Sequence, residues 1–258
     1  MKVFFKMILM NIKSQLEYKK AFIISTIGTF LVTFLLTISV KFLFMEFTQI
    51  GEWTYYEVLF LVGIVYFVFS LSEMFLRGLD KFDDIIRKGD FDRIMIRPQN
   101  LLLQSTSMEF DLAKIGRTVQ ALSIIIIALI HLQIEWTISK IMVFLLINLG
   151  LFIIFLGTFI LKATFCFWTI EGLEFMNIIS EGGKKVSMYP INIYVKWFAF
   201  IFTFIFPFGM VNYFPVLYIF GKADNWYYGL TPLYTIVYLV ICILVWRLGV
   251  RHYESTGS

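Results

Sequence analysis

Charged residues are scarce in this sequence of 258 residues: they make up 16% of it, against about a quarter in an average soluble domain. Cysteine is almost absent, with only Cys166 and Cys242, which excludes a disulfide-stapled secreted scaffold. Only five prolines occur, so a collagen-like chain is excluded as well. In contrast, 59% of the residues are hydrophobic and 30 are Phe, with a mean hydropathy of +0.82. The composition predicts an integral membrane protein.

Long apolar runs follow one another along most of the chain. A helix needs about 20 apolar residues to cross roughly 30 Å of hydrocarbon. Six runs meet or approach that length, and they cover residues 21–45, 55–76, 115–132, 138–168, 195–211 and 230–248. We therefore expect an all-α integral membrane protein with six transmembrane helices, which form a single domain over residues 21–258.

The lysines and arginines indicate how these helices are oriented, because basic residues accumulate in cytoplasmic loops. If the N-terminus is cytoplasmic, 19 of the 22 basic residues fall on the cytoplasmic side, with Lys162 extending toward it. The three that fall on the outer side are Lys41, Lys140 and Lys222. This asymmetry predicts that both termini lie in the cytoplasm. We see no cleavable signal peptide, since Lys6 interrupts the early apolar run.

Residues 1–20 precede the first predicted span and have an amphipathic pattern. Apolar residues recur at helical spacing while lysines occupy another face of the same helix. This pattern predicts an interfacial helix on the inner leaflet, with its lysines near anionic headgroups. A membrane-surface anchor and a part in energy coupling are both compatible with it.

The predicted cytoplasmic loop, residues 77–114, carries charges of both signs. Between Arg77 and Arg97 it has six basic and five acidic residues, whereas a surface for nucleic acids or anionic lipids would be strongly basic. Gly89 is placed to end a first short helix, and Pro98 to stop a second element. We expect a compact knob that docks into a partner protein. A plain solvated connector is the alternative.

Sequence motifs for catalysis are missing from the chain. Residues 171–196, read as a cytoplasmic loop, contain Gly-Gly-Lys but not a phosphate-binding loop, because Ile178 replaces its first glycine and Lys185 its Ser or Thr. The sequence also has no cluster of His, Cys, Asp or Glu at the spacing of metal ligands, no G-x-S-x-G nucleophile elbow and no paired carboxylates. We expect that the chain is not an enzyme by itself and binds no cofactor of its own.

The segment from Pro207 to Trp226 follows the fifth predicted span. Its two prolines interrupt regular helix, and its tyrosines and tryptophan prefer the membrane–water interface. We expect a short re-entrant element on the outer side, between the fifth and sixth helices. An aromatic belt with no further role is the alternative.

Ionisable residues within the predicted spans are few. Lys41, Glu57, Glu73, His131 and Lys162 each lie near a span end, where we expect contact with headgroups or water to satisfy them. They form no relay of acids across the bilayer, such as a proton-coupled transporter needs. An amphipathic or lipid-like substrate fits so apolar a set of helices better than a sugar or an ion.

Five segments together resemble the permease subunits of bacterial type-2 ABC exporters. The most specific are two blocks, IRKGDFDRIMIRP at residues 86–98 and PFGMVNYFP at residues 207–215. The others are EYKKAF at residues 17–22, WTYYEVLFL at residues 53–61 and FCFW at residues 165–168. The second block is the end of a longer matching segment, residues 189–215, which begins with YPINIY. The resemblance spans nearly the whole chain and supports six helices.

The resemblance implies a permease of the bacterial plasma membrane that pairs with a second permease, identical or homologous, and with two cytoplasmic ATP-binding subunits that carry ATP and Mg²⁺. In that family the N-terminal helix and the loop between the second and third spans contact the ATPase. We therefore expect Phe82, Ile85 and Ile86 to fill an apolar groove on the ATPase. Other residues expected at this coupling surface are Asp80, Arg87, Gly89, Asp90, Asp92, Arg93, Arg97 and Pro98. The resemblance also implies a short re-entrant element on the outer side, between the fifth and sixth spans. The residues expected in this element are Pro207, Asn212, Tyr213 and Pro215.

Two other functions remain open from the residues alone. The chain could be a membrane anchor or sensor that recruits a cytoplasmic partner and transports nothing. It could also be a secondary transporter driven by an ion gradient, in which case transport would survive ATP depletion.

Overall fold

The computed structural model describes residues 2–169, 174–223 and 225–253, and these residues are almost entirely helical. The one β-type pairing among them is an isolated bridge between Ile50 and Trp53. Short 3₁₀ turns cover Leu112–Lys114, Ile191–Ile193 and Trp226–Leu233, and Ile201–Ile205 form a π-helix. The α-helices are α1 (Lys2–Glu17), α2 (Lys19–Glu46), α3 (Tyr55–Phe75), α4 (Arg77–Asp80), α5 (Phe82–Arg87), α6 (Asp90–Met95), α7 (Leu101–Ser107), α8 (Ile115–His131), α9 (Ile138–Phe165), α10 (Glu174–Ser187), α11 (Lys196–Phe200), α12 (Phe208–Ile219) and α13 (Tyr234–Arg251).

Five helical segments are long and apolar enough to cross a membrane. They are α2, α3, the continuous segment Leu112–His131 with α8, α9, and the segment Trp226–Arg251 with α13. Each overlaps a span predicted from the sequence, with ends that differ by a few residues. The all-helical membrane fold is therefore confirmed, with a sixth crossing if one bent pair of helices counts as a span.

That bent pair corrects the fifth predicted span, residues 195–211, which is not one continuous helix. Lys196–Ile205 and Phe208–Ile219 meet at 95° across Phe206 and Pro207. Pro207 has no backbone N–H to continue a helix, and the π-helical turn before it already departs from regular α geometry. The predicted break in this region is present, but it lies inside the predicted span.

Helix α10 corrects a second expectation, because residues 174–187 were read as part of a loop. Met176, Ile179, Gly183 and Val186 recur at helical spacing, and all four are buried. This stripe packs α10 against α3, α9 and α12. Lys184 and Lys185 therefore belong to a helix of the bundle and not to an open loop. Residues 170–173 of the predicted loop lie outside the described part of the chain.

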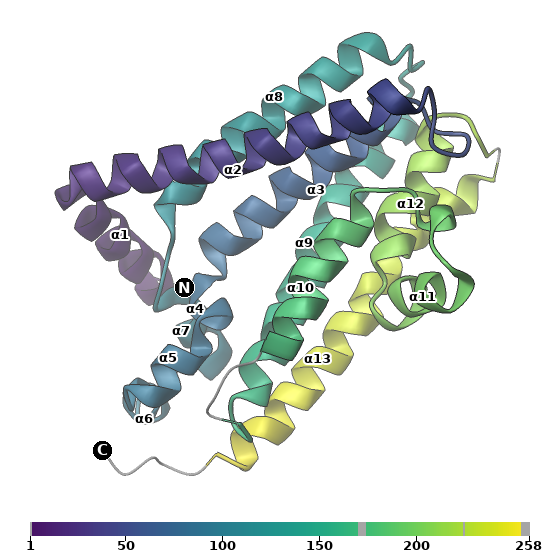
Figure 1. Ribbon diagram of the computed structural model, residues 1–258. Helices are drawn as coiled ribbons and strands as arrows, with labels where there is room; N and C mark the ends of the chain where they lie inside the picture. The colour runs from purple at the N-terminus through teal and green to yellow at the C-terminus, as the bar shows by residue number, and fades with distance from the viewer. Residues whose placement is uncertain (1, 170–173, 224, 254–258) are drawn as a thin grey trace.

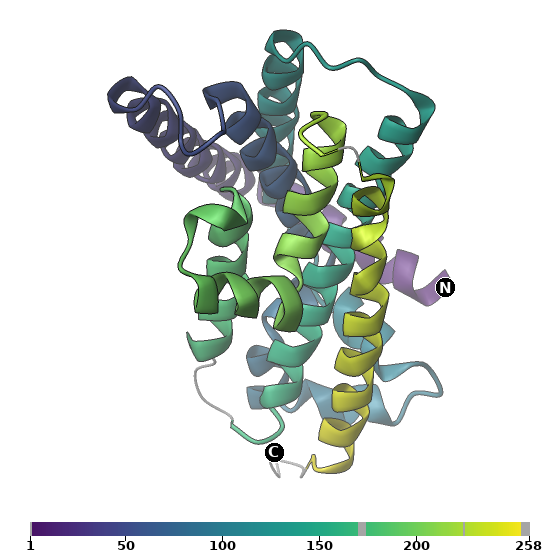
Figure 2. The ribbon, with the colours of Figure 1, turned by 90° about the vertical axis from the view of Figure 1, so that its right-hand side faces the viewer.

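Helix α3 forms the centre of the bundle and α2 its periphery. In the most apolar part of α3, 83% of the residues are buried, against 6% for α2. α3 packs against both α8 and α9, while α13 packs along α9. Figure 1 shows α2 and α8 running side by side, away from α9 and α13. The short helices α4–α7 gather at one end of the bundle, near the C-terminal end of α13 (Figure 2).

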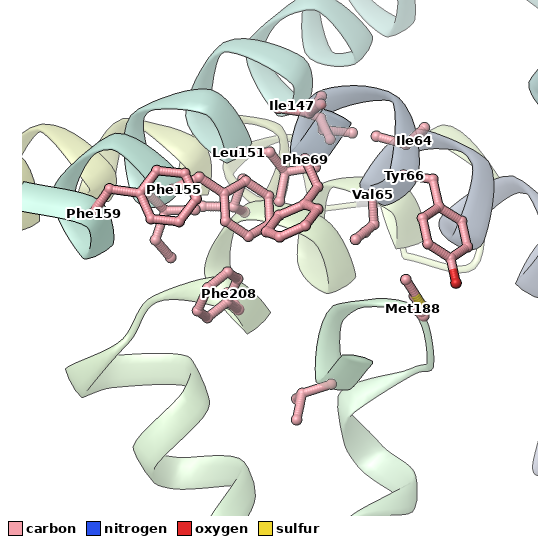
Figure 3. Close-up of a cluster of buried hydrophobic side chains, with 14 of the residues drawn as sticks. Ile64, Val65, Tyr66, Phe69, Ile147, Leu151, Phe155, Phe159, Met188 and Phe208 are labelled. Carbon is pink, nitrogen blue, oxygen red and sulfur yellow. The ribbon is translucent and has the colours of Figure 1, made fainter. Parts of the chain in front are cut away.

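Aromatic rings join α3, α9 and α12 in the middle of the bundle (Figure 3). Phe69 lies 4.9 Å from Phe155, and Phe155 lies 5.5 Å from Phe208, measured between ring centroids. Gly183 of α10 allows Phe208 to approach, since a Cβ atom there would stand 2.2 Å from the ring. This close packing fixes α12 against the centre of the bundle.

Candidate functional site

The segment between α3 and α8 folds into four short helices, α4–α7, where two elements were predicted. Gly89 ends α5 with φ +67°, a left-handed conformation that glycine adopts without steric cost. The turn at this glycine is therefore as predicted. Helix α6 then begins at Asp90, and the chain turns again at Pro98 before α7. We call residues 77–107 the coupling segment.

The apolar face of the coupling segment points into the protein itself. Phe82, Ile85 and Ile86 are at most 4% exposed. These three side chains therefore cannot fill a groove on a partner while this fold is kept, which corrects the contact expected of them. The physical reason is that an amphipathic helix beside a bundle buries its apolar face against the nearest apolar surface, here its own chain.

An aromatic cluster holds the coupling segment to the ends of α9 and α13. Phe82 lies 5.4 Å from Phe167, which follows α9, and 5.4 Å from Trp246 of α13. Phe91 of α6 lies 5.3 Å from Phe167 and 4.9 Å from Tyr253. Such pairs add about 0.5–1.5 kcal/mol each beyond the area that they bury. α5 and α6 are therefore packed rigidly against both helices.

Tyr253 adds a hydrogen bond to this cluster, because its hydroxyl donates to Oδ1 of Asp92 at 2.9 Å. Partial burial, together with the carboxylate of Asp92, raises the pKa of Tyr253 to about 12. Its phenol therefore stays protonated and able to donate at every physiological pH. The C-terminal end of α13 is thereby joined to α6.

Replacing Tyr253 with Phe removes this hydrogen bond and keeps the ring in the cluster. We expect the free energy of unfolding at neutral pH to fall by about 1 kcal/mol, as for the loss of one hydrogen bond. Thermal unfolding in detergent micelles would measure the change, with the exposed Tyr227 replaced by Phe as the matched control. Equal changes in the two variants would contradict a role for the Asp92 contact.

Asp80 of the coupling segment makes an ion pair with the last turn of α9. Nζ of Lys162 lies 2.7 Å from Oδ1 of Asp80, and Nη1 of Arg77 lies 2.6 Å from Oδ2. The side chains of Lys162 and Asp80 are 11% and 15% exposed. Lys162 was expected to reach toward headgroups or water, and this is wrong because a carboxylate within the chain neutralises it.

Glu73 makes a second ion pair at the inner end of α3. Its Oε1 lies 3.0 Å from Nζ of Lys114, and its Oε2 accepts from Arg117. The sequence placed Glu73 at a span end, where water or headgroups were expected to satisfy it; in the structure it is 8% exposed and paired within the chain. Helical periodicity gives no signal for such pairs, because their partners lie more than 40 residues away.

A polar cavity of about 480 Å³ lies beside these ion pairs. α3, α4, α5, α9 and α10 all contribute to its walls. α10 supplies Asn177, Ser180 and Glu181, and Glu181 pairs with Lys184 of the same helix. Sequence reasoning missed this cavity because it read α10 as a loop. The residues that line it are Phe69, Glu73, Arg77, Asp80, Lys81, Asp83, Asp84, Phe159, Lys162, Asn177, Ser180 and Glu181.

The exposed surface of the coupling segment is its tip, at the end of α6 and the turn that follows. Arg87, Arg93, Arg97 and Pro98 are exposed, whereas Asp80, Asp90 and Asp92 are partly buried and Gly89 is buried. Ile96 is 84% exposed, although it was not among the expected contacts. An isoleucine so exposed at a helix end is an apolar side chain that the chain's own core does not cover.

The N-terminal helix α1 is fastened to the return of the coupling segment. Nδ2 of Asn11 donates to the carbonyl oxygens of Ser107 and Met108, at 3.3 and 3.2 Å. Oε1 of Gln15 accepts from the backbone N–H of Leu112 at 2.9 Å. A helix near the predicted residues 1–20 is therefore present, and it is joined to the coupling segment by side chains.

At the other end of the molecule, the residues expected in the re-entrant element lie in or just before α12. Nδ2 of Asn212 donates to the carbonyl oxygen of Ser187 at 2.6 Å, so α12 is held to the end of α10. The ring of Tyr213 packs against that of Trp53, with 5.8 Å between the ring centroids. Pro207 stands at the bend and Pro215 is buried within α12. A re-entrant role for this element stays a prediction.

Lys222, three residues after α12, fastens this end of the element to the start of α3. Its Nζ lies 2.8 Å from Oε2 of Glu57 and 4.6 Å from the centre of the Trp53 ring. Glu57 also accepts from the backbone N–H of Thr54, where it completes a capping box. Glu57 is thus paired inside the chain, which corrects the expectation that headgroups or water satisfy it.

Comparison with known proteins gives one match that covers nearly the whole chain. The family model described as "ABC-2 family transporter protein" matches residues 4–257. No curated protein and no solved structure was found to be similar. Within the described residues, no three His, Cys, Asp or Glu side chains are grouped so that they could hold a metal ion. By the family match and its apolar helices, the chain is a multi-pass membrane protein that belongs to the ABC-2 transporter family.

Proposed function

We propose that the chain is the permease subunit of an ATP-driven exporter in a bacterial plasma membrane. A permease role follows from the family. The proposal adds a partner permease, identical or homologous, and two cytoplasmic ATP-binding subunits that carry ATP and Mg²⁺. The observation that carries it is the attachment of the coupling segment to α9 and α13 by the aromatic cluster and by the Lys162–Asp80 pair.

Movement of an ATP-binding subunit would reach the bundle through this attachment. A push on the exposed tip, at Arg93, Ile96 and Arg97, is resisted by the buried Phe82 and Phe91 and is passed to α9 and α13. Close-packed interiors transmit displacement because they compress little. α1 would move with the same unit, since Asn11 and Gln15 bind its far end. The chain itself hydrolyses nothing in this scheme.

Replacing Ile96 with Asp tests the docking surface without disturbing the fold. The side chain is 84% exposed, so we expect the free energy of unfolding to change by no more than about 0.5 kcal/mol. An apolar contact in the centre of an interface is worth about 2 kcal/mol or more, so we expect co-purification with the ATP-binding subunit to fall at least tenfold. The readouts are the amount of ATP-binding subunit retained and the ATP hydrolysis of the assembled complex.

Ile96→Val is the matched control, because it keeps an apolar side chain at the tip. Normal assembly and ATP hydrolysis are expected for it. Undiminished assembly of the Ile96→Asp variant would contradict docking through this tip. Transport that continues after ATP is depleted would contradict the ATP-driven role altogether.

A further inference from the structure

Helix α10 packs on the bundle through a buried apolar stripe, and a polar face beside that stripe borders the cavity. Asn177, Ser180, Glu181 and Lys184 follow the i, i+3, i+4, i+7 spacing of a single helix face, and the first three line the polar cavity. On another face, Phe175 and Ile178 are 66% and 67% exposed. In the interior of a membrane protein, polar side chains face either partners or a water-filled space. The polar face of α10, together with the cavity that it lines, therefore indicates a hydrated space beside this helix.

The cavity is large enough to take more than water. Its volume of about 480 Å³ falls within the range of about 300–1,000 Å³ in which small-molecule sites lie. It is bounded by the coupling segment on one side and by α3, α9 and α10 on the others. Asn177 and Glu181 are exposed, so the cavity is open to the surroundings. A ligand could therefore reach it without crossing the apolar core.

The charges around the cavity are matched one to another. Each of its five carboxylates has a cationic partner within 4.0 Å: Glu73 has Lys114 and Arg117, Asp80 has Arg77 and Lys162, Asp83 has Arg87, Asp84 has Lys81, and Glu181 has Lys184. A ligand ion of one sign would leave a carboxylate or a cation without its partner, which is costly in a partly buried site. A zwitterion carries a charge of each sign, so it can pair with both members of an ion pair that it separates.

Two phenyl rings complete the walls. Phe69 and Phe159 both line the cavity, and their rings lie 6.4 Å apart. Nζ of Lys184 already sits 4.1 Å from the centre of the Phe69 ring, so this ring face holds an ammonium group in the structure. The site thus combines an ammonium-binding ring face with paired charges.

We propose that this cavity is a hydrated vestibule of the permease that takes the zwitterionic head of an amphiphile from the cytoplasmic side. The proposal rests on the permease role and names the substrate class for it. The ammonium of the ligand would replace Lys184 at Phe69 and Glu181, and its anionic group would pair with a released cation such as Lys184 or Lys162.

Hydration is tested by the reaction of introduced cysteines with a charged, membrane-impermeant methanethiosulfonate reagent. In water the thiolate attacks the sulfur of the reagent, a mixed disulfide forms and methanesulfinate leaves. The variants are Asn177→Cys and Ser180→Cys, and Ile178→Cys is the matched control on the same helix. The full chain in nanodiscs is used, with the buried Cys166 and Cys242 giving the background. We expect both cavity positions to react at least about tenfold faster than the control. Equal rates would overturn the vestibule.

The headgroup is tested by protection of Asn177→Cys from the same reagent. Octylphosphocholine, octyl sulfate and octyltrimethylammonium share a chain length and are used below the concentrations that disrupt the nanodisc. We expect octylphosphocholine to slow the reaction several-fold more than either single-charged amphiphile. Protection by one single-charged amphiphile alone, or equal protection by all three, would overturn the zwitterionic class.

The vestibule and the permease role can fail separately. If the cavity cysteines and the control react at equal rates in a complex that still assembles and hydrolyses ATP, the vestibule is disproved and the permease role stands. If the cavity cysteines are labelled rapidly in a chain that never binds an ATP-binding subunit, the ATP-driven role is disproved and the hydrated cavity stands. Normal reaction of the Ile178→Cys control with a lipid-soluble maleimide would show that its thiol is present and free.

Discussion

Lys162→Ala is expected to lower the free energy of unfolding by about 3 kcal/mol, because the partly buried carboxylate of Asp80 loses the ammonium group that pairs with it. Arg77 remains 2.6 Å from the other carboxylate oxygen, so the loss falls at the low end for a broken buried pair. Reversible unfolding of the purified chain in mixed micelles would measure it. We also expect transport-linked ATP hydrolysis of the complex to fall, since α9 loses its ionic link to the coupling segment.

Lys81→Ala is the control for this prediction. Lys81 also pairs with an aspartate of the coupling segment, but it is 45% exposed and its Nζ lies 4.0 Å from Asp84. Pairs of this kind contribute about 0–1 kcal/mol. If Lys81→Ala lowers the free energy of unfolding as much as Lys162→Ala does, the Lys162–Asp80 pair contributes no more than an exposed pair and the prediction is wrong. In the double variant Lys162→Ala/Asp80→Ala, the loss should be smaller than the sum of the single losses.

Phe82→Ala is expected to cost about 3–5 kcal/mol, the usual range for removing a fully buried phenylalanine. The ring is 0% exposed and lies within 5.4 Å of Phe91, Phe167 and Trp246. Removing it leaves a cavity where α5, α9 and α13 meet, so the coupling segment should also become accessible to protease. Thermal unfolding and limited proteolysis would measure the two effects.

Ile96→Ala gives the contrast, because it removes an apolar side chain from the same segment at an exposed position. We expect its unfolding free energy to stay within about 0.5 kcal/mol of the parent chain. The pair of variants thus separates the two faces of the coupling segment, one that stabilises the fold and one that we propose docks on the ATP-binding subunit. The reverse pattern, a stable Phe82→Ala and an unstable Ile96→Ala, would show that the segment is oriented the other way.

The parts of the fold that depend on local sequence were predictable. Runs of apolar residues predicted α2, α3, α8, α9 and α13, since crossing a bilayer requires length and little else. Gly89 predicted the turn between α5 and α6, because helices commonly end at a glycine in the left-handed conformation. These features can be read from fewer than 30 consecutive residues.

The parts that depend on distant partners were not predictable in the same way. An apolar face such as Phe82–Ile86 can bury itself against its own chain or against another protein, and its spacing is the same in both cases. α10 was missed because its polar stripe lowers its hydropathy, and no local signal tells that Lys184, which pairs with Glu181 one turn away, will also meet the ring of Phe69. Asp80 and Lys162 lie 82 positions apart, so their pairing is visible only in the fold.

The charged side chains of α10 have a consequence for how the protein is made. Glu181, Lys184 and Lys185 would each oppose the insertion of this helix into a bilayer on its own. α3 and α9, which are synthesised earlier, offer the surface against which α10 packs, and α12, which holds its end through Asn212, is synthesised later. α10 therefore gains its hydrogen bond to Asn212 only after α12 is made, and a chain that ends at Ser187 and has left the ribosome should hold α10 less firmly than the full chain does.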